Sequence, residues 1–192
     1  MAGQSARIFR AKVAGAYRRL GELGLVVESS GNVSLRVGNV VFLTPTGIPF
    51  YRLRGKEVVV MDLLGNVLSK GIPSSEWRLH INLLQGRPDI KTVVHAHPPF
   101  ATILACAGKE LPVIHDEGRL FFGEKVPIAE WAPPGTWELA RAVLDALGTG
   151  KAVLLSRHGM VTVGPSLSQA LILAEKLEEM AKICVFSHFL IL

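Results

Sequence analysis

Apolar residues near the start of the chain recur at the spacing of an amphipathic helix, with arginine and lysine residues between them. Positions three to five residues apart share one face of an α-helix. We therefore expect a helix from Ser5 to Leu23 that ends at Gly21 or Gly24. Its apolar face is formed by Ile8, Val13, Ala16 and Leu20.

Three short segments with apolar residues at alternate positions follow this helix. Val33–Val37 and Val40–Leu43 flank a Gly-Asn pair, which is typical of a two-residue hairpin connection. Glu57–Asp62 is followed by a second Gly-Asn pair. The pattern predicts a β-hairpin and a third strand in this part of the chain.

Helical and strand patterns alternate after Gly71. A helix should open at Pro73–Glu76 and run to about Gln85, because a hydroxyl residue stands where an N-cap belongs and a carboxylate stands in the first turn. Ile90–His97 is rich in β-branched residues and predicts a strand that stops at Pro98, followed by a helix through Cys106 to Gly108. Further strands are expected at Val113, Val126–Ala129 and Ala152–Leu155.

The last two predicted helices have clear N-terminal signals. Pro133–Thr136 precedes a helix to Leu147, and Ser166 and Gln169 have the spacing of a capping box before a long final helix. The sequence contains no internal repeat and no linker. Residues 1–192 are therefore expected to form a single α/β domain, with a mixed, largely antiparallel sheet flanked by helices.

The composition fits an aliphatic core in a reducing compartment. Of 192 residues, 49% are hydrophobic and only 7% are aromatic. Cys106 and Cys184 both fall in apolar helical patterns, which indicates buried free thiols. Arg7, Arg10 and Lys12 interrupt the apolar pattern that a secretion signal would need. We therefore expect a cytoplasmic protein.

Neither a membrane nor a nucleic acid is an expected partner. The apolar end from Ile183 to Leu192 is too short to cross a bilayer, so it is expected to pack against the core or another subunit. The net charge of +5 comes from scattered residues, with no basic block and no interleaved aromatic residues. Small anionic substrates suit this distribution better than nucleic acid, although it also fits an ordinary solvated surface.

The strongest chemical signal is the segment Val93–Pro98, which contains His95 and His97. Residues i and i+2 of a strand project from the same face, so the two imidazoles can bind one zinc ion. His158, at the end of another apolar strand, is the candidate for a third ligand. The alternative is that two histidines lie on a surface edge and the third lies elsewhere.

Two other classes of metal enzyme share the His-x-His spacing. Metal-dependent isopeptidases need a serine and an aspartate soon afterwards, and residues 101–110 contain neither. Amidohydrolases need an eight-stranded barrel of about 250 residues, which is longer than this chain. Both classes are excluded.

Polar residues elsewhere add candidates for a catalytic site. Glu76 lies at the start of a predicted helix, where the positive end of the dipole favours anions, although an ordinary helix-start glutamate would also fit. Ser30–Ser34 and Thr44–Gly47 offer hydroxyl, amide and glycine groups that suit a phosphate. Each of these segments could also be a routine turn.

In this order along the chain, the segments resemble the class II aldolase/adducin family. The resemblance covers nearly the whole sequence. The matching segments are Ser30-Gly-Asn-Val-Ser34, Leu43-Thr-Pro-Thr-Gly-Ile-Pro49, Pro73-Ser-Ser-Glu-Trp-Arg-Leu-His80, Val94-His-Ala-His-Pro98 and His158-Gly159.

The resemblance implies a three-layer fold and a zinc-dependent lyase. His95, His97 and His158 correspond to the zinc ligands, with one ion per subunit. Glu76 corresponds to the catalytic acid/base, which can also bind the metal when no substrate is present. The implied reaction cleaves a ketose 1-phosphate similar to L-fuculose 1-phosphate into dihydroxyacetone phosphate and an aldehyde, in a homotetramer. The residues that resemble the phosphate pocket are Asn32, Thr46, Gly47, Ser74 and Ser75.

Two features depart from the aldolase pattern. Asp116 stands where a catalytic tyrosine is expected after His115, and the sequence ends before the C-terminal tail that carries a second functional tyrosine. These groups handle the aldehyde, so Asp116 becomes the candidate for that role. The alternative is that Asp116 points away from the site and only caps or solvates a loop.

An L-ribulose-5-phosphate 4-epimerase shares the fold and the zinc triad and uses an aspartate in this region, which keeps the epimerase alternative open. A dehydratase of a thioether pentulose phosphate is a more distant relative. A non-catalytic adducin-like binding module lacks the metal ligands that are present here.

Overall fold

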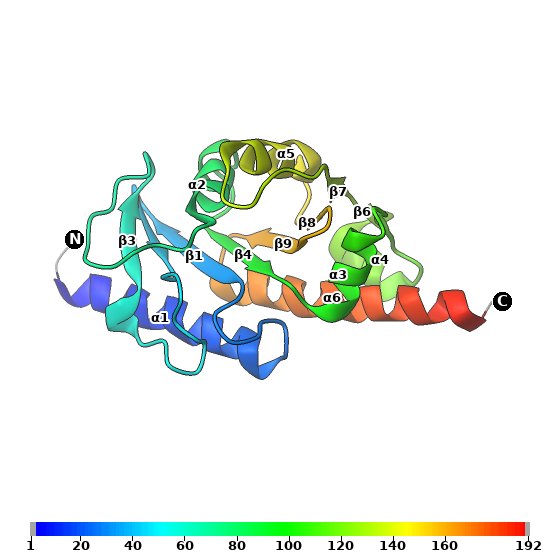
Figure 1. Cartoon of the computed structure of the whole chain (residues 1–192), viewed down its shortest axis with the longest axis horizontal. Coiled ribbons are helices and arrows are strands. Elements are labelled where there is room, and N and C mark those ends of the chain that lie inside the picture. Colours follow the sequence, from blue (N-terminus) through cyan, green and yellow to red (C-terminus); the bar gives the residue numbers. More distant parts are fainter. Residues whose placement is uncertain (1–2, 191–192) are drawn as a thin grey trace.

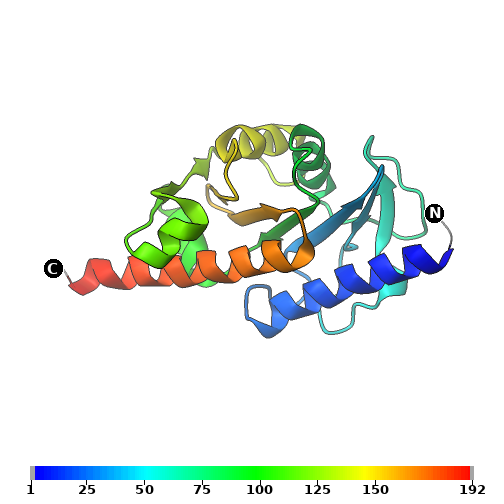
Figure 2. The same ribbon diagram turned by 180° about the vertical axis from the view of Figure 1, so that it is seen from behind.

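The computed structural model describes residues 3–190, in which a seven-stranded sheet lies between two layers of helices (Figures 1 and 2). The strands of this sheet are β1 (Asn32–Val37), β2 (Val40–Leu43), β3 (Val59–Asp62), β4 (Thr92–Ala96), β7 (Ile128–Ala129), β8 (Ala152–Leu155) and β9 (Gly159–Gly164). The helices are α1 (Gly3–Glu22), α2 (Trp77–Gly86), α3 (Pro99–Cys106), α4 (Asp116–Phe122), α5 (Trp137–Leu147) and α6 (Leu167–Leu190). A short 3₁₀ helix (Gly55–Glu57) and a two-stranded sheet of β5 (Leu111–Pro112) and β6 (Lys125–Val126) complete the elements.

The strands of the main sheet lie in the order β3-β2-β1-β4-β9-β8-β7. Every neighbouring pair is antiparallel except β7 and β8, which are parallel. The expectation of a mixed, largely antiparallel sheet is confirmed. The sequence analysis missed β9, which follows β8 after a turn of three residues. All six residues of β9 are buried, so the strand lacks the polar alternation that marks a half-exposed strand.

Successive residues of each strand face opposite helix layers, which divides the core in two. Val33, Val94 and Met160 pack with α1, α3 and α6 on one side. Val93, Val161 and Val163 pack with α2 and α5 on the other side. In Figure 1, α2 and α5 lie above the sheet and α1 and α6 lie below it. The result is the three-layer arrangement that the family resemblance implies.

Most predicted helices and strands are confirmed, but two boundaries differ at residues of chemical interest. β4 ends at Ala96, so His97 follows the strand. α2 begins at Trp77, and Glu76 occupies its N-cap position instead of its first turn. A single turn precedes α2, because the backbone N–H of Trp77 donates to the Ser74 carbonyl and the Ser74 hydroxyl accepts from the backbone N–H of Glu76.

The expectation that both cysteines are buried is wrong for Cys106, which is exposed, while Cys184 is buried. Cys106 is the last residue of α3, and Ala105 next to it already points into the core. Consecutive helix residues point about 100° apart, which turns Cys106 outward. Cys184 and Val185 pack on the core, as expected for the apolar C-terminal segment, but Ile191 and Leu192 lie outside the described residues. Within residues 3–190, no helix is long and apolar enough to cross a membrane.

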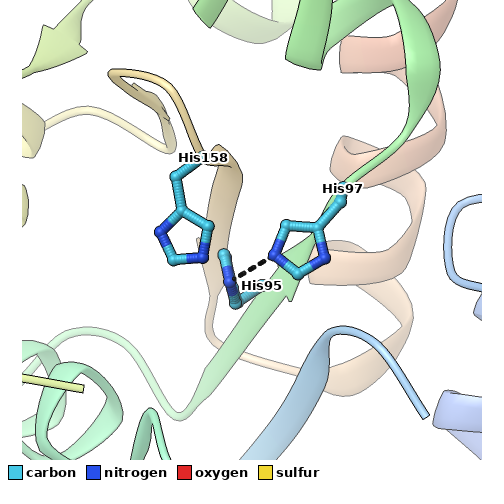
Figure 3. Close-up of side chains that lie close together, drawn as sticks. All are labelled: His95, His97 and His158. Carbon is cyan, nitrogen blue, oxygen red and sulfur yellow. Dashed lines mark hydrogen bonds between the residues drawn. The ribbon is translucent and has the colours of Figure 1, made fainter. Parts of the chain in front are cut away.

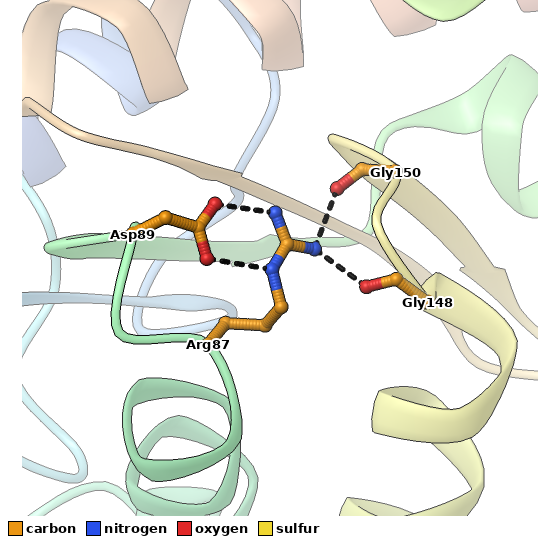
Figure 4. A network of polar contacts seen from close by, with 4 residues as sticks. All are labelled: Arg87, Asp89, Gly148 and Gly150. Atoms are coloured by element: carbon orange, nitrogen blue, oxygen red, sulfur yellow. Dashed lines mark hydrogen bonds and ion pairs between the residues drawn. The ribbon is translucent and has the colours of Figure 1, made fainter.

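Arg87 fixes the ends of α2 and α5 to each other (Figure 4). Its guanidinium makes two hydrogen bonds to the Asp89 carboxylate, at 2.7 and 2.8 Å. It also donates to the carbonyl oxygens of Gly148 at 2.6 Å and Gly150 at 3.0 Å, just beyond the C-terminus of α5. A planar guanidinium holds such partners in a defined geometry. This contact joins the C-terminal end of α2 to the C-terminal end of α5.

Candidate active site

A cavity of about 220 Å³ opens where β1, β4 and the turn between β8 and β9 meet the start of α2. It collects residues that are far apart in the sequence, from Ser29 to His158. The lining residues are Ser29, Ser30, Gly31, Asn32, Pro45, Thr46, Ser74, Ser75, Glu76, His95, His97 and His158. Among the residues that the structure describes, the lining contains three imidazoles, one carboxylate, hydroxyl groups and an amide, but no lysine or arginine.

The three predicted metal ligands converge in this cavity (Figure 3). One nitrogen from each of His95, His97 and His158 lies within 4.8 Å of the other two. The Nε2 atoms of His95 and His97 are 3.0 Å apart. The Nδ1 atom of His95 lies 3.0 Å from the Met160 carbonyl, which can only accept, so Nδ1 carries the proton and Nε2 presents its lone pair to the cluster.

Electrostatics favours neutral imidazoles in this cluster. Burial lowers the pKa of His95 well below its usual value, and the neighbouring His97 and His158 lower it further. Burial and the charge of His158 lower the pKa of His97 to about 4, and burial also lowers the pKa of His158. Neutral imidazoles have the free lone pairs that a metal needs. The donor set therefore fits a divalent cation, and three nitrogens at this spacing suit zinc.

Contacts behind the ligands explain how His97 and His158 reach the cluster. Glu178 of α6 accepts from the backbone N–H groups of Phe100 and Ala101, which holds the start of α3 directly after His97. His158 lies in the turn that leads into β9. Gly159 permits close packing there, because a Cβ atom would lie 2.5 Å from the Ala96 carbonyl. The spacing of the histidines in the sequence revealed none of these supports.

Glu76 lies in the same cavity and is only 6% exposed. Among the described residues, its Oε2 atom is buried and has no hydrogen-bond partner. Burial raises the pKa of the carboxyl group, and a backbone hydrogen bond from Gly135 partly offsets this rise. A buried, unpartnered carboxylate oxygen beside three imidazoles can bind a cation or exchange a proton.

Sequence reasoning missed the role of Gly135 next to Glu76. Gly135 has a φ of +76° and lies so close to the turn before α2 that a Cβ atom would be 3.0 Å from the Ser75 carbonyl. Its own carbonyl accepts from Arg78 at 3.0 Å. From the sequence alone, the Pro-Pro-Gly-Thr segment predicts only the start of α5, whose N-cap is Thr136. The glycine was the available signal, because only glycine adopts this φ without strain.

The predicted phosphate residues are brought together with one exception. Asn32, Thr46, Ser74 and Ser75 all line the cavity, whereas Gly47 does not. Asn32 is directly opposite His95 in the β1–β4 ladder, so the amide and the histidine cluster are neighbours. The lining also includes Ser29, which the sequence analysis did not single out, and two residues of the motif Ser30–Ser34, namely Ser30 and Gly31.

Asp116 is not brought to this cavity by the described part of the chain. It is the first residue of α4, it is exposed, and His115 before it caps the helix by accepting from the backbone N–H of Gly118. It is absent from the residues that line the cavity. Within the described residues of one chain, therefore, the three histidines and Glu76 line one cavity, and Asp116 is separate from it.

Comparisons with known proteins identify the class to which this site belongs. Residues 11–185 match the family described as Class II Aldolase and Adducin N-terminal domain, so the chain belongs to this family. Together with the names of its relatives, this makes the protein a class II aldolase, which is a lyase.

The relatives include enzymes that act on different sugar phosphates. A 5-methylthioribulose-1-phosphate/5-deoxyribulose-1-phosphate aldolase of Rhodospirillum rubrum is 40% identical over 167 residues, which are 87% of this chain and 76% of that protein. The L-fuculose phosphate aldolase of Escherichia coli K12 is 38% identical over 161 residues, which are 84% of this chain and 75% of that protein.

Solved structures agree with this assignment. An L-fuculose 1-phosphate aldolase superposes with a TM-score of 0.90 at 35% identity, covering 95% of this chain and 87% of that chain. The L-fuculose-1-phosphate aldolase from Thermus thermophilus superposes with a TM-score of 0.85 at 28% identity, covering 96% and 95% of the two chains.

Proposed function

We propose that this class II aldolase cleaves a ketose 1-phosphate into dihydroxyacetone phosphate and an aldehyde, with one zinc ion per subunit held by His95, His97 and His158. Glu76 is the acid/base and an additional metal ligand in the absence of substrate. The observation that supports this proposal is the convergence of three imidazole nitrogens within 4.8 Å, in one cavity with the unpartnered Oε2 of Glu76.

Glu76 moves the proton at carbon 3 of the substrate. When the bond between carbons 3 and 4 breaks, carbon 3 gains a proton and the hydroxyl group on carbon 4 loses one. A carboxyl group with a pKa raised by burial is closer to the operating pH, which favours proton transfer in both directions. Bound by the three histidines, zinc would supply Lewis-acid stabilisation of the negative charge that develops on the substrate oxygens.

Neutral groups anchor the phosphate and orient the substrate. Asn32, Thr46, Ser74 and Ser75 line the same cavity as Glu76, and Gly47 follows Thr46 in the turn after β2. Amide, hydroxyl and backbone N–H groups can donate to phosphate oxygens without a charged side chain. Fixing the phosphate at one end places carbon 3 near Glu76 and lowers the entropic cost of reaction.

Asp116 is proposed to act on the aldehyde half of the substrate. Because it is exposed at the start of α4 and does not line the cavity of its own chain, this role requires a site that is shared between subunits. The tetramer that the family resemblance implies would supply such a contact. Replacement by asparagine is expected to leave proton exchange at carbon 3 within a few-fold while changing turnover by about tenfold. Equal turnover in Asp116→Asn would remove Asp116 from the mechanism.

A substrate panel tests the proposed reaction. The zinc-loaded protein is incubated with L-fuculose 1-phosphate, 5-methylthioribulose 1-phosphate and 5-deoxyribulose 1-phosphate, and release of dihydroxyacetone phosphate is measured. Ribulose 5-phosphate is the comparison substrate for the epimerase alternative. Release from at least one ketose 1-phosphate is expected. Efficient epimerisation without cleavage would replace the aldolase proposal by the epimerase.

The proposal includes a homotetramer in the cytoplasm. Sedimentation of the zinc-loaded protein should give four times the 20.8 kDa mass of the chain. A monomer that retains full turnover would contradict the need for another subunit at the aldehyde side.

A further inference from the structure

His80 is a fully buried polar residue for which the proposed reaction has no role. It lies on α2, one helical turn after Glu76, and is 0% exposed. Its ring reaches across to β1, where Nε2 is 2.5 Å from the Asn32 side-chain oxygen and Nδ1 is 2.7 Å from the Ser34 hydroxyl. The two β1 residues are two positions apart and therefore lie on the same face of the strand. One imidazole thus connects α2 to the amide that lines the cavity.

The two hydrogen bonds must run in opposite directions. Burial lowers the pKa of His80 to about 3, so the ring is neutral and has one N–H group and one lone pair. In the first arrangement, the Ser34 hydroxyl donates to Nδ1, and Nε2–H donates to the Asn32 oxygen. In the second arrangement, Nδ1–H donates to Ser34, and the Asn32 amide nitrogen turns round to donate to Nε2.

Hydrogen counting favours the first arrangement. Ser34 is fully buried, and its hydroxyl makes only the contact with His80 among the described residues. In the second arrangement, the hydroxyl hydrogen would lose its acceptor, which costs free energy in a buried site. In the first arrangement, every hydrogen of the Ser34–His80 pair has an acceptor. The amide oxygen of Asn32 is then engaged by His80, and its NH₂ group is left without a partner in the described structure.

We propose that His80 is a positioning residue that fixes the polarity of the Asn32 amide, so that Asn32 presents N–H donors to the phosphate of the substrate. This inference rests on the proposed function for the identity of the anion. Among the described residues, no lysine or arginine lines the cavity, and Glu76 adds a carboxylate to it. Neutral donors therefore carry the recognition of the phosphate, and an amide turned the other way would direct a carbonyl oxygen at it.

The side chain of His80 acts on Asn32 and not directly on the metal ligands. Its ring contacts the Ser34 hydroxyl and the Asn32 side-chain oxygen, and among the described residues it makes no hydrogen bond to His95, His97 or His158. A change at His80 is therefore expected to affect phosphate binding while leaving the three metal ligands in place. This separates the proposed role from a general loss of structure.

Binding of inorganic phosphate to the zinc-loaded protein provides the first test. His80→Phe keeps a planar ring but removes both nitrogens, and it should weaken phosphate binding about tenfold. His80→Gln can still donate to Asn32 and accept from Ser34, and should stay within about threefold. Thr162→Val is the matched control, because it removes a buried hydrogen bond to the Ala170 carbonyl elsewhere in the sheet, and should leave phosphate affinity unchanged.

Calorimetric titration gives the affinity and elemental analysis gives the zinc content. Weaker phosphate binding at unchanged zinc content in His80→Phe, with rescue in His80→Gln, is the expected result. In cleavage assays, the KM should rise while kcat stays within a few-fold. Unchanged phosphate affinity in a folded His80→Phe protein would overturn the proposal.

Ser34→Ala provides a second variant in case His80→Phe fails to fold. It removes only a hydroxyl group, and with it the donor that selects the tautomer of His80. Phosphate binding should weaken about threefold or more, because the amide is no longer held in one orientation. Unchanged affinity in Ser34→Ala would equally overturn the proposal.

Neutron diffraction of the deuterium-exchanged holoenzyme tests the tautomer without any substitution. Deuterium on Nε2 of His80, with Nδ1 bare and the ND₂ group of Asn32 facing the cavity, is expected. Deuterium on Nδ1 would overturn the proposal. Failure of every ketose 1-phosphate to react would remove the proposed function, but the phosphate titration and the diffraction result would still decide the role of His80.

Discussion

The two faces of the central sheet carry different kinds of buried residue. The face under α1, α3 and α6 is packed mainly with aliphatic residues such as Val33, Val94 and Met160. The face under α2 and α5 has a similar aliphatic region, but near the start of α2 it contains Ser34, Asn32 and His95 from the strands. Polar groups are thus concentrated at one end of one face. Stability and chemistry are therefore expected to respond to different substitutions.

The largest effect on chemistry is expected from His95→Ala, which removes a fully buried imidazole from the cluster. Lewis-acid stabilisation contributes several kcal/mol, so turnover should fall by about 10³-fold or more. Elemental analysis should show a loss of zinc. His115→Ala, which alters a histidine at the cap of α4, should keep the full zinc content. Equal zinc content in both variants would remove His95 from the ligand set.

Leu177→Ala tests the opposite face, because Leu177 of α6 is 0% exposed in the aliphatic core. Loss of three buried carbon atoms should lower the free energy of unfolding by about 2–5 kcal/mol. Denaturant titration measures this change. The zinc content and the turnover of the folded fraction should match those of the parent. A variant that keeps its stability but loses zinc would show that the two faces are not separate in function.

Glu76→Gln tests whether metal binding and proton transfer depend on different residues of the site. The zinc content should stay near that of the parent, because the three histidines remain. Exchange of the carbon 3 proton of dihydroxyacetone phosphate with solvent should fall about 10²-fold, since an amide is a poor base. Deuterium incorporation followed by NMR measures the exchange. Exchange at the parent rate would reduce Glu76 to a structural role at the start of α2.

Gly135→Ala examines the support behind Glu76. The added Cβ atom would lie 3.0 Å from the Ser75 carbonyl on a backbone with a φ of +76°. The expected result is a roughly tenfold fall in kcat with little change in zinc content, because displacement of the loop moves Glu76. Arg141→Ala, on the exposed side of α5, is the control. A drop in stability with unchanged kcat would limit Gly135 to a packing role.

The last prediction concerns the pH dependence of stability through His80. Its pKa is lowered from 6.5 to about 3 in the folded protein, so the unfolded chain takes up a proton first as the pH falls. Stability should therefore decrease as the pH falls from 6.5 to about 3, at roughly 1 kcal/mol per pH unit for this group. His80→Gln lacks this contribution and should show a shallower loss. Denaturant titrations of the parent and of His80→Gln at several pH values measure the difference. An equal loss of stability in both proteins as the pH falls would contradict the contribution of His80.

The sequence by itself determined most of the order of helices and strands and indicated the candidate site residues. The helical spacing of α1, the hairpin of β1 and β2 and the cap of α5 are local signals, and the structure agrees with each. His95 and His97 were identifiable as a pair because alternate residues of an extended segment point to the same side, although β4 itself ends at Ala96. Glu76 and the phosphate residues were recognised through their order along the chain, which matches a known family.

The tertiary structure alone decided which strands are neighbours and what supports the site. β9 has no polar alternation, so its central place between β4 and β8 was invisible in the pattern. The contacts of Gly135 with α2 and of Glu178 with the start of α3 join residues that are tens of positions apart. The same is true of His80, whose hydrogen bonds reach 46 and 48 residues back to β1. A local pattern encodes the period of an element, whereas the partner of a buried polar atom is fixed only when the elements pack.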